Sequence, residues 1–241
     1  YSNQSSPVSV VGGHTFTQIA AGRECSFALD TAGAVWVWGY GYHGSLGINT
    51  GDYVNFNSPQ ALLSITPPYP SSPLLYNQIT GSIGGSFAWG LAIGTISGDT
   101  AAWGYGTIGQ LGENSFSYSR SSPILVAGNR TFANLSAGGS TSVALDTAGL
   151  AWAWGYGYNG ELGNNGVVLA ASSPVAVAGG LSFITISTGH HFSIALDIAG
   201  QAWVWGQNSV ANYAGQLGTN DTANYSSPVT VVGGNFFVEV A

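Results

Sequence analysis

The stretch Ala151-Trp152-Ala153-Trp154-Gly155, followed after a Tyr/Gly turn by Leu162-Gly163, decides the fold of this chain. The pattern occurs four times: a Trp-Gly pair is followed by Leu-Gly and, after a gap, by Ser-Pro. The Trp before Gly stands at positions 38, 103, 154 and 205, at spacings of 65, 51 and 51 residues. A period near 50 residues indicates one supersecondary unit repeated along the chain, as in propellers and solenoids.

Each unit divides into four short strands. A Ser-Pro segment such as Pro174-Val175-Ala176-Val177 opens the unit, a Phe-x-x-Ile/Leu segment follows, and a third segment ends in Ala-Leu-Asp. The Asp and the Gly three residues later predict a tight hairpin turn, in which the carboxylate accepts hydrogen bonds from the next amides. These Asp residues are Asp30, Asp146 and Asp197, and Asp99 is expected to play the same part in the second unit. The Trp-x-Trp-Gly strand then runs back, which completes the strand set of a β-propeller blade.

Large and small apolar residues alternate in the Trp strands. In Val35-Trp36-Val37-Trp38 both Trp side chains lie on one face of the strand and both Val side chains on the other. Both faces of the sheet are therefore apolar, one covered by large Trp rings and the other by small side chains. This pattern predicts that every sheet packs between two neighbouring sheets, with the Trp residues between the blades.

The sequence thus predicts an all-β fold, a β-propeller made of a single repeat array over residues 1–241. The approximate units are 5–57, 58–121, 122–172 and 173–226, with a partial unit at 227–241. Residues 226–234 repeat residues 5–13 almost letter for letter. We therefore expect about four complete blades plus the start of a fifth, as part of a larger ring or as an open arc.

Composition excludes several classes of partner. Charged residues make up 5% of the chain, and three cationic side chains stand against ten carboxylates, for a net charge of −7. Binding to a phosphate backbone needs many cationic side chains to displace its counterions, and this chain has three. We therefore expect no nucleic-acid partner. No apolar run reaches the ~18 residues of a membrane span, so we expect no membrane insertion. The lone Cys25 excludes an internal disulfide and is expected to be a small buried side chain.

No constellation of residues indicates catalysis. His190 and His191 are adjacent, so in a strand they point to opposite faces, and no third ligand stands nearby. The carboxylates outside the repeat turns show no pairing suited to acid/base work. Runs such as Gly39-Tyr40-Gly41 open no helix, so they do not predict a phosphate cradle. We expect no metal, no cofactor and no enzyme activity.

Loop aromatics are the best candidates for recognition, because Tyr offers a flat apolar ring and a hydroxyl at low entropic cost. They recur in the turn after Trp-Gly and in the two loops that carry insertions. The candidates for binding a protein or a glycan are Tyr40, Tyr42, His43, Tyr69, Tyr105, Tyr156, Tyr158, Asn159 and Tyr213. The alternative is that these side chains only cover the blade edges.

The pattern Trp-Gly-x-x-x-x-Gly-x-Leu-Gly, with an upstream Gly and Ala-Leu, resembles the regulator of chromosome condensation repeat over essentially the whole chain. The resemblance implies a β-propeller, usually of seven blades. Members include an exchange factor for a small GTPase, a secreted inhibitor of β-lactamase, and domains that only bind partners. The Asn that the family often has two residues after Trp-Gly is matched here by Asn208 alone, and the charged loops of the exchange factor have almost no counterpart.

The composition, rich in Gly, Ser, Asn and Tyr, favours a non-enzymatic binding or assembly module outside the cytosol, secreted, at the cell surface or on a virion. The alternative is a regulatory propeller, either a guanine nucleotide exchange factor for a small GTPase or a secreted enzyme inhibitor. A protruding loop at Pro67–Tyr69 would favour the inhibitor.

Overall fold

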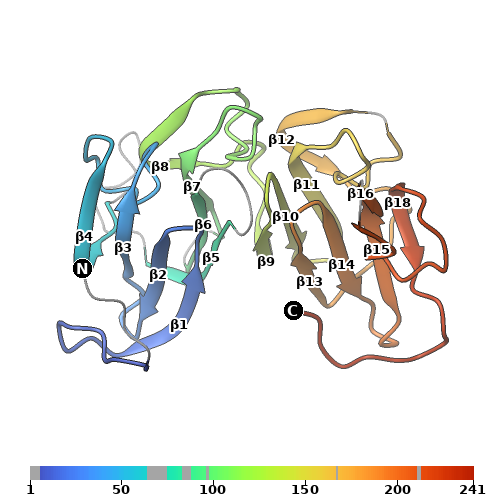
Figure 1. The fold of residues 1–241 in the computed structure, drawn as a ribbon, viewed down its shortest axis with the longest axis horizontal. Coiled ribbons are helices and arrows are strands. Elements are labelled where there is room, and N and C mark those ends of the chain that lie inside the picture. Colours follow the sequence, from blue (N-terminus) through green and yellow to red (C-terminus); the bar gives the residue numbers. More distant parts are fainter. Residues whose placement is uncertain (1–5, 64–74, 83–87, 96–97, 167, 211–212) are drawn as a thin grey trace.

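Four antiparallel sheets of four strands each follow one another in an arc in the computed structural model of the chain (Figure 1). The structure describes residues 6–63, 75–82, 88–95, 98–166, 168–210 and 213–241. No helix occurs in these ranges, so none of their segments is a helix long and apolar enough to cross a bilayer. The prediction of four propeller blades is confirmed.

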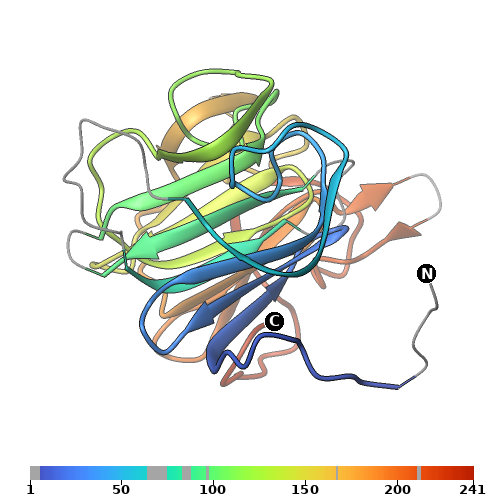
Figure 2. The same ribbon diagram turned by 90° about the vertical axis from the view of Figure 1, so that its left-hand side faces the viewer.

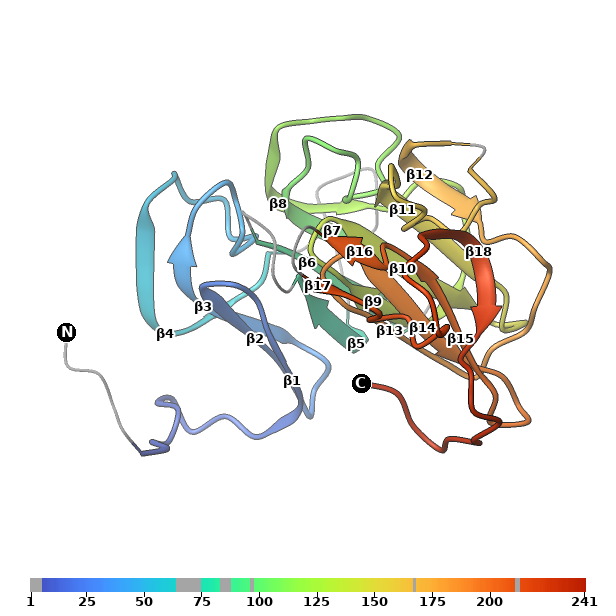
Figure 3. The same ribbon diagram turned by 45° about the vertical axis from the view of Figure 1, so that its right-hand side comes forward.

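The blades are numbered in chain order, from blade 1 (blue) to blade 4 (orange to red), as Figures 1 and 3 show. Blade 1 contains β1 (Phe16–Ala21), β2 (Cys25–Asp30), β3 (Val35–Gly41) and β4 (Val54–Ala61). Blade 2 contains β5 (Tyr76–Gly81), β6 (Trp89–Gly94), β7 (Thr100–Tyr105) and β8 (Ser119–Leu125). Blade 3 contains β9 (Phe132–Ala137), β10 (Thr141–Asp146), β11 (Ala151–Tyr156) and β12 (Ala170–Ala176). Blade 4 contains β13 (Thr185–Thr188), β14 (Phe192–Leu196), β15 (Ala202–Gly206) and β18 (Tyr225–Thr230), with a small hairpin of β16 (Ser209–Val210) and β17 (Tyr213–Ala214).

The first strands of the blades line the inside of the arc. β1 lies against β5, β5 against β9 and β9 against β13. The last strands of the two end blades, β4 and β18, stand at opposite outer sides in Figure 1. The loops after the Trp strands gather at one end of the sheets, the upper end in Figure 1, and the Asp turns at the other.

The sheets do not coincide with the sequence units, because each Ser-Pro segment pairs backward onto the Trp strand before it. Val37 pairs with Gln60, and Ala153 pairs with Val175. The Ser-Pro segment is therefore the last strand of a blade and not the first strand of a unit. The Ser-Pro segment at Pro7–Val10, also expected to be a strand, forms none. Each of the four Trp strands already pairs with the Ser-Pro strand that follows it in the chain. The segment before β1 leaves the sheets (Figure 2), and Val8 is 66% exposed.

The C-terminal segment is placed like the first strand of a further blade. Phe237 N donates to Gly200 O, the carbonyl of a turn Gly in blade 4, at 2.8 Å. Tyr76 N makes the same bond to Gly33 O of blade 1, also at 2.8 Å, where β5 begins blade 2. The predicted start of a fifth blade is therefore visible as a docking contact, although residues 235–241 form no strand.

Trp side chains fill the spaces between blades. The three Trp residues that precede Gly in blades 2, 3 and 4 are fully buried, and each indole Nε1 donates to a backbone carbonyl of the preceding blade. The pairs are Trp103 with Ser45, Trp154 with Gln110 and Trp205 with Glu161, at 3.1, 2.9 and 3.1 Å. The predicted inter-blade packing is confirmed for these residues.

The Asp turns do more than the sequence predicted. Asp30 Oδ1 accepts hydrogen bonds from Ala32 N and Ala34 N at 2.9 Å each, as expected for a tight turn. Its second oxygen accepts the indole Nε1 of the half-buried Trp36 at 2.8 Å, which ties the turn to the Trp strand. The same three bonds occur at Asp146 with Trp152 and at Asp197 with Trp203.

The expectation that Asp99 is the turn residue of the second unit is wrong. Gly94 N donates to Asp99 O at 2.8 Å, just as Asp30 N donates to Ala34 O in blade 1 at 3.0 Å. Asp99 therefore takes the place of Ala34, and a Gly stands where the other blades have Asp. Strand β7 gives the reason. It has Ala101 at the position where the other blades have a Trp, whose indole N–H the Asp carboxylate would accept.

We expect Trp154→Ala to reduce the free energy of unfolding by about 3–5 kcal/mol, because it empties a fully buried site and removes one of the two donors to Gln110 O, the other being Ser142 Oγ at 2.8 Å. Trp152→Ala, at the half-buried position two residues earlier, is the matched control and should cost less. Urea denaturation followed by far-UV circular dichroism measures both. Equal losses at the two positions would contradict the inter-blade role.

Candidate protein-binding face

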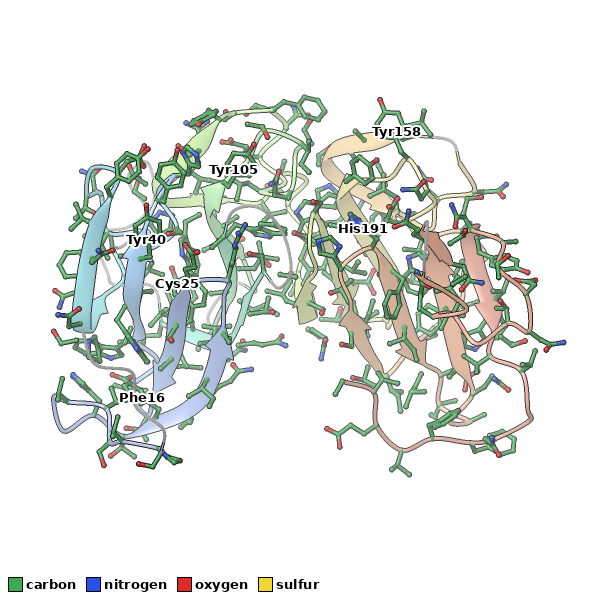
Figure 4. All side chains as sticks on the ribbon, viewed as in Figure 1. Phe16, Cys25, Tyr40, Tyr105, Tyr158 and His191 are labelled. Carbon is green, nitrogen blue, oxygen red and sulfur yellow. The ribbon has the colours of Figure 1, made fainter. Side chains whose placement is uncertain are left out.

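The loops after the Trp strands are shaped by the Gly that follows each Trp. Gly39 has φ of 110°, and a Cβ placed on it would lie 2.6 Å from Glu24 O, so only Gly fits this bulge. The turn that follows is closed by the side chain before Leu-Gly. Ser45 Oγ accepts Tyr42 N at 3.2 Å, and Glu161 Oε2 accepts Asn159 N at 2.8 Å. This geometry holds the Tyr side chains of the turn at the upper end of the blades (Figure 4).

One aromatic group spans blades 1 and 2, and we call it the first cluster. It consists of Tyr40, Tyr42, His43, Tyr53, Tyr105 and Tyr118. The ring centroids of Tyr42 and His43 are 3.6 Å apart, and those of Tyr42 and Tyr53 are 4.7 Å apart. His43 links the blades, because its Nε2 lies 3.0 Å from the hydroxyl of Tyr118.

Burial and a carboxylate set the electrostatics of the first cluster. The His43 side chain is buried, and desolvation lowers its pKa, while the charge of Asp52 acts in the opposite direction. Asp52 Oδ1 accepts His43 N at 2.7 Å, and its second oxygen lies 3.9 Å from His43 Nδ1. A hydrogen bond with Tyr53 raises the pKa of Tyr42 to about 12. The first cluster thus has one partly exposed carboxylate, that of Asp52, beside the buried His43.

The second cluster spans blades 3 and 4 and consists of Tyr156, Tyr158, His190 and His191, above Glu161. The rings of Tyr156 and Tyr158 are 5.3 Å apart, and His191 lies 6.0 Å from Tyr156. His191 Nδ1 is 3.7 Å from Glu161 Oε1 and makes no hydrogen bond within the described structure. Burial lowers the pKa of His191 and raises that of Glu161, so both groups are driven toward their neutral forms.

A hollow between blades 2 and 3 lies between the two clusters. Tyr105, Gln110 and Ser140 are among the residues that line it. Cys25 is buried as predicted, and desolvation raises its pKa to about 12, so it offers no reactive thiolate. Within the described ranges, no group of three or more His, Cys, Asp or Glu side chains could hold a metal ion.

The structure brings most of the predicted binding residues together. Tyr40, Tyr42, His43 and Tyr105 meet in the first cluster, and Tyr156, Tyr158 and Asn159 belong to the second cluster or its turn. Tyr213 lies apart, in β17 of the small hairpin, and Tyr69 falls outside the described residues, together with the Pro67–Tyr69 loop.

Four residues of the clusters were missed as binding candidates: Tyr53, Tyr118, His190 and His191. Tyr53 and Tyr118 each stand seven residues after the Leu of Leu-Gly, at Leu46 and Leu111, so their common spacing was the available signal. His191 joins the second cluster from β14's entry loop, on the next blade. That contact depends on how the blades stack, and no spacing within one unit indicates it.

Glu161→Gln should stabilise the protein at neutral pH. Because burial raises the pKa of Glu161 in the folded state, the contribution of this carboxyl to stability is present in acid and is lost as the pH rises through the folded pKa. The Gln side chain keeps an acceptor for Asn159 N without a buried charge, as Gln110 does in blade 2 at 3.1 Å from Ile108 N. Thermal melts between pH 4 and 8 measure the difference, which should vanish toward the acid end.

Glu113→Gln is the matched control for that substitution. Glu113 accepts both Arg120 Nε and Nη2, at 2.7 and 2.6 Å, so removing its charge weakens an ion pair and should destabilise the protein. A loss of stability in Glu161→Gln at neutral pH would contradict the electrostatic description of this site.

Comparison with protein families matches residues 148–196 to the Regulator of chromosome condensation (RCC1) repeat, from the β10–β11 turn to the end of β14. The human protein named Probable E3 ubiquitin-protein ligase HERC4 is 31% identical over 220 residues, which is 90% of this chain and 19% of HERC4. Human E3 ubiquitin-protein ligase HERC2 is 29% identical over 218 residues, 89% of this chain and 4% of HERC2. The chain thus spans only a small part of these relatives.

Solved structures with the same fold include human WBSCR16, with a TM-score of 0.79 and 22% identity over 95% of this chain and 56% of WBSCR16. Prp20p of Saccharomyces cerevisiae, a protein studied for its binding to Gsp1p and histones, has a TM-score of 0.76 and 20% identity over 94% of this chain and 52% of Prp20p. Four sheets built on the Trp-Gly and Leu-Gly repeat, the repeat match and these relatives agree. The chain belongs to the RCC1-repeat family of β-propellers.

Proposed function

We propose that this chain is a regulatory propeller that binds a protein through the end of the blades where the first and second clusters lie. Two structures of one RCC1-fold protein support the proposal, because yeast RCC1 (Prp20) is described with its binding to Gsp1p and histones in one and bound to Kap60 in the other. The ligase activity in the names of HERC4 and HERC2 is not proposed for this chain, which spans 19% and 4% of them.

Tyr53 carries the proposal. It is 65% exposed, and its backbone has φ of 68°, a left-handed conformation that is unfavourable for an aromatic residue. Tyr42 packs against its ring, so the cluster holds Tyr53 in place although no core surrounds it. A rigid exposed aromatic ring on a pre-organised loop is the usual anchor of a protein interface. Tyr158 of the second cluster, 62% exposed, is a second such ring.

The charge of the chain points to a basic partner surface. The net charge is −7, and Asp52 lies beside the rings of the first cluster with its side chain 45% exposed. A cationic side chain of the partner can stack on Tyr42 or Tyr53 and pair with this carboxylate. Such a contact predicts association that slows as the salt concentration rises.

This proposal replaces the expectation of an adhesive module, because the comparisons support a regulatory propeller better and give no support to a glycan partner. The absence of enzyme activity and a location outside the cytosol remain predictions from the sequence. Guanine nucleotide exchange on a small GTPase is the second candidate, favoured by the similarity to yeast RCC1 (Prp20), which is described with its binding to Gsp1p.

The double variant Tyr53→Ala/Tyr158→Ala should bind core histones or a small GTPase about 30-fold more weakly, the effect of removing a hot spot of about 2 kcal/mol. Ile198→Ala is the matched control, because Ile198 is 90% exposed in the Asp turn at the opposite end of blade 4. Surface plasmon resonance gives the affinities. The proposal fails if the chain binds neither probe, or if both variants bind like the parent.

A nucleotide-release assay separates the two candidates. The chain is added to a small GTPase loaded with a fluorescent guanine nucleotide, and the release rate is followed. We expect binding without a faster release, because Arg23, Arg120 and Arg130 are the chain's only cations and Arg120 is held in the ion pair with Glu113. Accelerated release that Tyr53→Ala/Tyr158→Ala abolishes would instead establish the exchange role.

A further inference from the structure

The turns after the Trp strands of blades 1, 2 and 3 have the same length, so their side chains can be compared position by position. The first residue after Trp-Gly is a Tyr in each, at Tyr40, Tyr105 and Tyr156. The residue two positions later is also a Tyr in blades 1 and 3, where its ring lies 6.1 Å from that of Tyr40 and 5.3 Å from that of Tyr156. In blade 2 this position is Thr107, so the turn of Tyr105 lacks its second ring.

The loop that leads into the second strand of each blade also has matching positions. Ser140 O accepts Tyr156 N at 3.0 Å in blade 3, and His191 O accepts Gln207 N at 2.8 Å in blade 4, so Ser140 and His191 are equivalent. Between blades 3 and 4, the imidazole of His191 lies 6.0 Å from the ring of Tyr156, with Nδ1 3.7 Å from Glu161 Oε1. Between blades 2 and 3, the short side chain of Ser140 leaves the hollow instead.

The hollow is therefore the counterpart of the space that His191 fills at the next blade boundary. Three residues that line it, Tyr105, Gln110 and Ser140, stand at the positions of the three residues that form the His191 site. Its volume is about 210 Å³, and an engineered apolar cavity of about 150 Å³ is enough to bind benzene. A five-membered aromatic ring thus fits into the hollow.

The side chain of Gln110 decides which ring the hollow can hold. Gln110 is 1% exposed, and its Oε1 accepts Ile108 N at 3.1 Å. Its amide nitrogen donates to no acceptor among the described residues. A buried N–H without an acceptor is unfavourable, so a ligand that supplies an acceptor is favoured here. The neutral imidazole ring carries such an acceptor on its unprotonated nitrogen.

The lining of the hollow favours a neutral ring over a cation. No charged side chain occurs among the described residues that line it, and Tyr105 is the titratable one among them. His190 of blade 4 packs against the lining residue Gly139, whose N donates to His190 O at 3.1 Å. Trp89 adds an apolar wall, because its Nε1 already donates to Ser142 Oγ at 3.3 Å. Burying a charge in such surroundings is costly.

We propose that the hollow binds a neutral imidazole ring, presented as a His side chain by the protein that binds across the two clusters. The bound ring takes the place that His191 takes at the next boundary, with Gln110 Nε2 donating to its unprotonated nitrogen and Tyr105 beside it. Only the source of the ring rests on the function proposed above. The site itself belongs to this chain and can be tested without a partner.

Titration of the isotope-labelled chain with imidazole, followed by NMR, tests the site. At about pH 8 the free ring is mostly neutral. We expect saturable shifts of the side-chain N–H signals of Gln110 and of the backbone amides of Tyr105 and Ser140. Pyrrole is the matched control, because it has the same ring size and no acceptor nitrogen, and it should bind about 10-fold more weakly. Imidazole that gives no saturable shift at these residues, or that binds no more tightly than pyrrole, would overturn the proposal.

Ser140→His tests the comparison with the His191 site, because it supplies the ring from the chain itself and should abolish imidazole binding. Thr147→His is the matched control, since it places a His in the exposed turn at the opposite end of blade 3, and it should bind imidazole like the parent. Gln110→Ser is a second test that keeps the turn closed, as Ser45 closes it in blade 1. It removes the amide donor and should weaken imidazole binding about 10-fold. Unchanged binding in either folded variant would contradict the site.

Surface plasmon resonance with core histones or a small GTPase tests the source of the ring. Ser140→His should weaken the binding of the protein probe about 10-fold, the effect of losing one anchoring side chain. Thr147→His should leave it unchanged. Protein binding that Ser140→His does not alter would overturn the His side chain as the source. Tyr53→Ala/Tyr158→Ala tests the proposed function and imidazole tests the hollow, so the two proposals can fail separately.

Discussion

The rest of this structure depends on one interaction, a hydrogen bond from a Trp indole N–H to a backbone carbonyl of the preceding blade. Trp103, Trp154 and Trp205 are fully buried, so each of these hydrogen bonds forms inside the packed boundary between two blades. The chain has few ion pairs with which to hold blades together, since only 5% of its residues are charged. The Trp rings of one blade pack against the small Val and Ala side chains of its neighbour, which buries apolar surface. The indole hydrogen bond fixes the register of that packing.

The same turn that offers the carbonyl also forms the candidate binding face. Its side chain before Leu-Gly closes the loop, as at Ser45 and Glu161, and this holds the Tyr residues at the upper end of the blades. Stability and recognition are thus coupled at these turns. The coupling explains why the second cluster tolerates a buried carboxyl with a raised pKa, because Glu161 caps its turn and accepts an indole through its backbone.

Repetition shows what the outer sides of blades 1 and 4 are built to contact. An exposed Ile19 alone would be an ordinary surface residue, but three buried equivalents show what such a face is built to contact. Gly215 in blade 4 gives the same result. Its equivalents Gly44, Gly109 and Gly160 each lie against the backbone of the last strand of the next blade.

Sequence alone determined the blades of this protein. The spacing of Trp-Gly and Leu-Gly, the alternation in Val35-Trp36-Val37-Trp38 and the Asp30 turn are local patterns, and strand pleat and turn chemistry act within a few residues. Local patterns also placed Tyr40, Tyr42, His43 and Tyr105 in loops on one end of the sheets. Where the repeat is imperfect, as at Asp99, the same reasoning failed, because the missing indole at Ala101 removes the need for an Asp.

Tertiary structure decided what meets across the blades. The Ser-Pro strand pairs backward onto the Trp strand, so none of the four Trp strands is left for Pro7–Val10. His43 bonds Tyr118 across 75 residues, and His191 reaches Glu161 from the next blade. These contacts depend on the angle and height at which one sheet stacks on another. The packing of whole faces sets that geometry, and no interval along the chain encodes it.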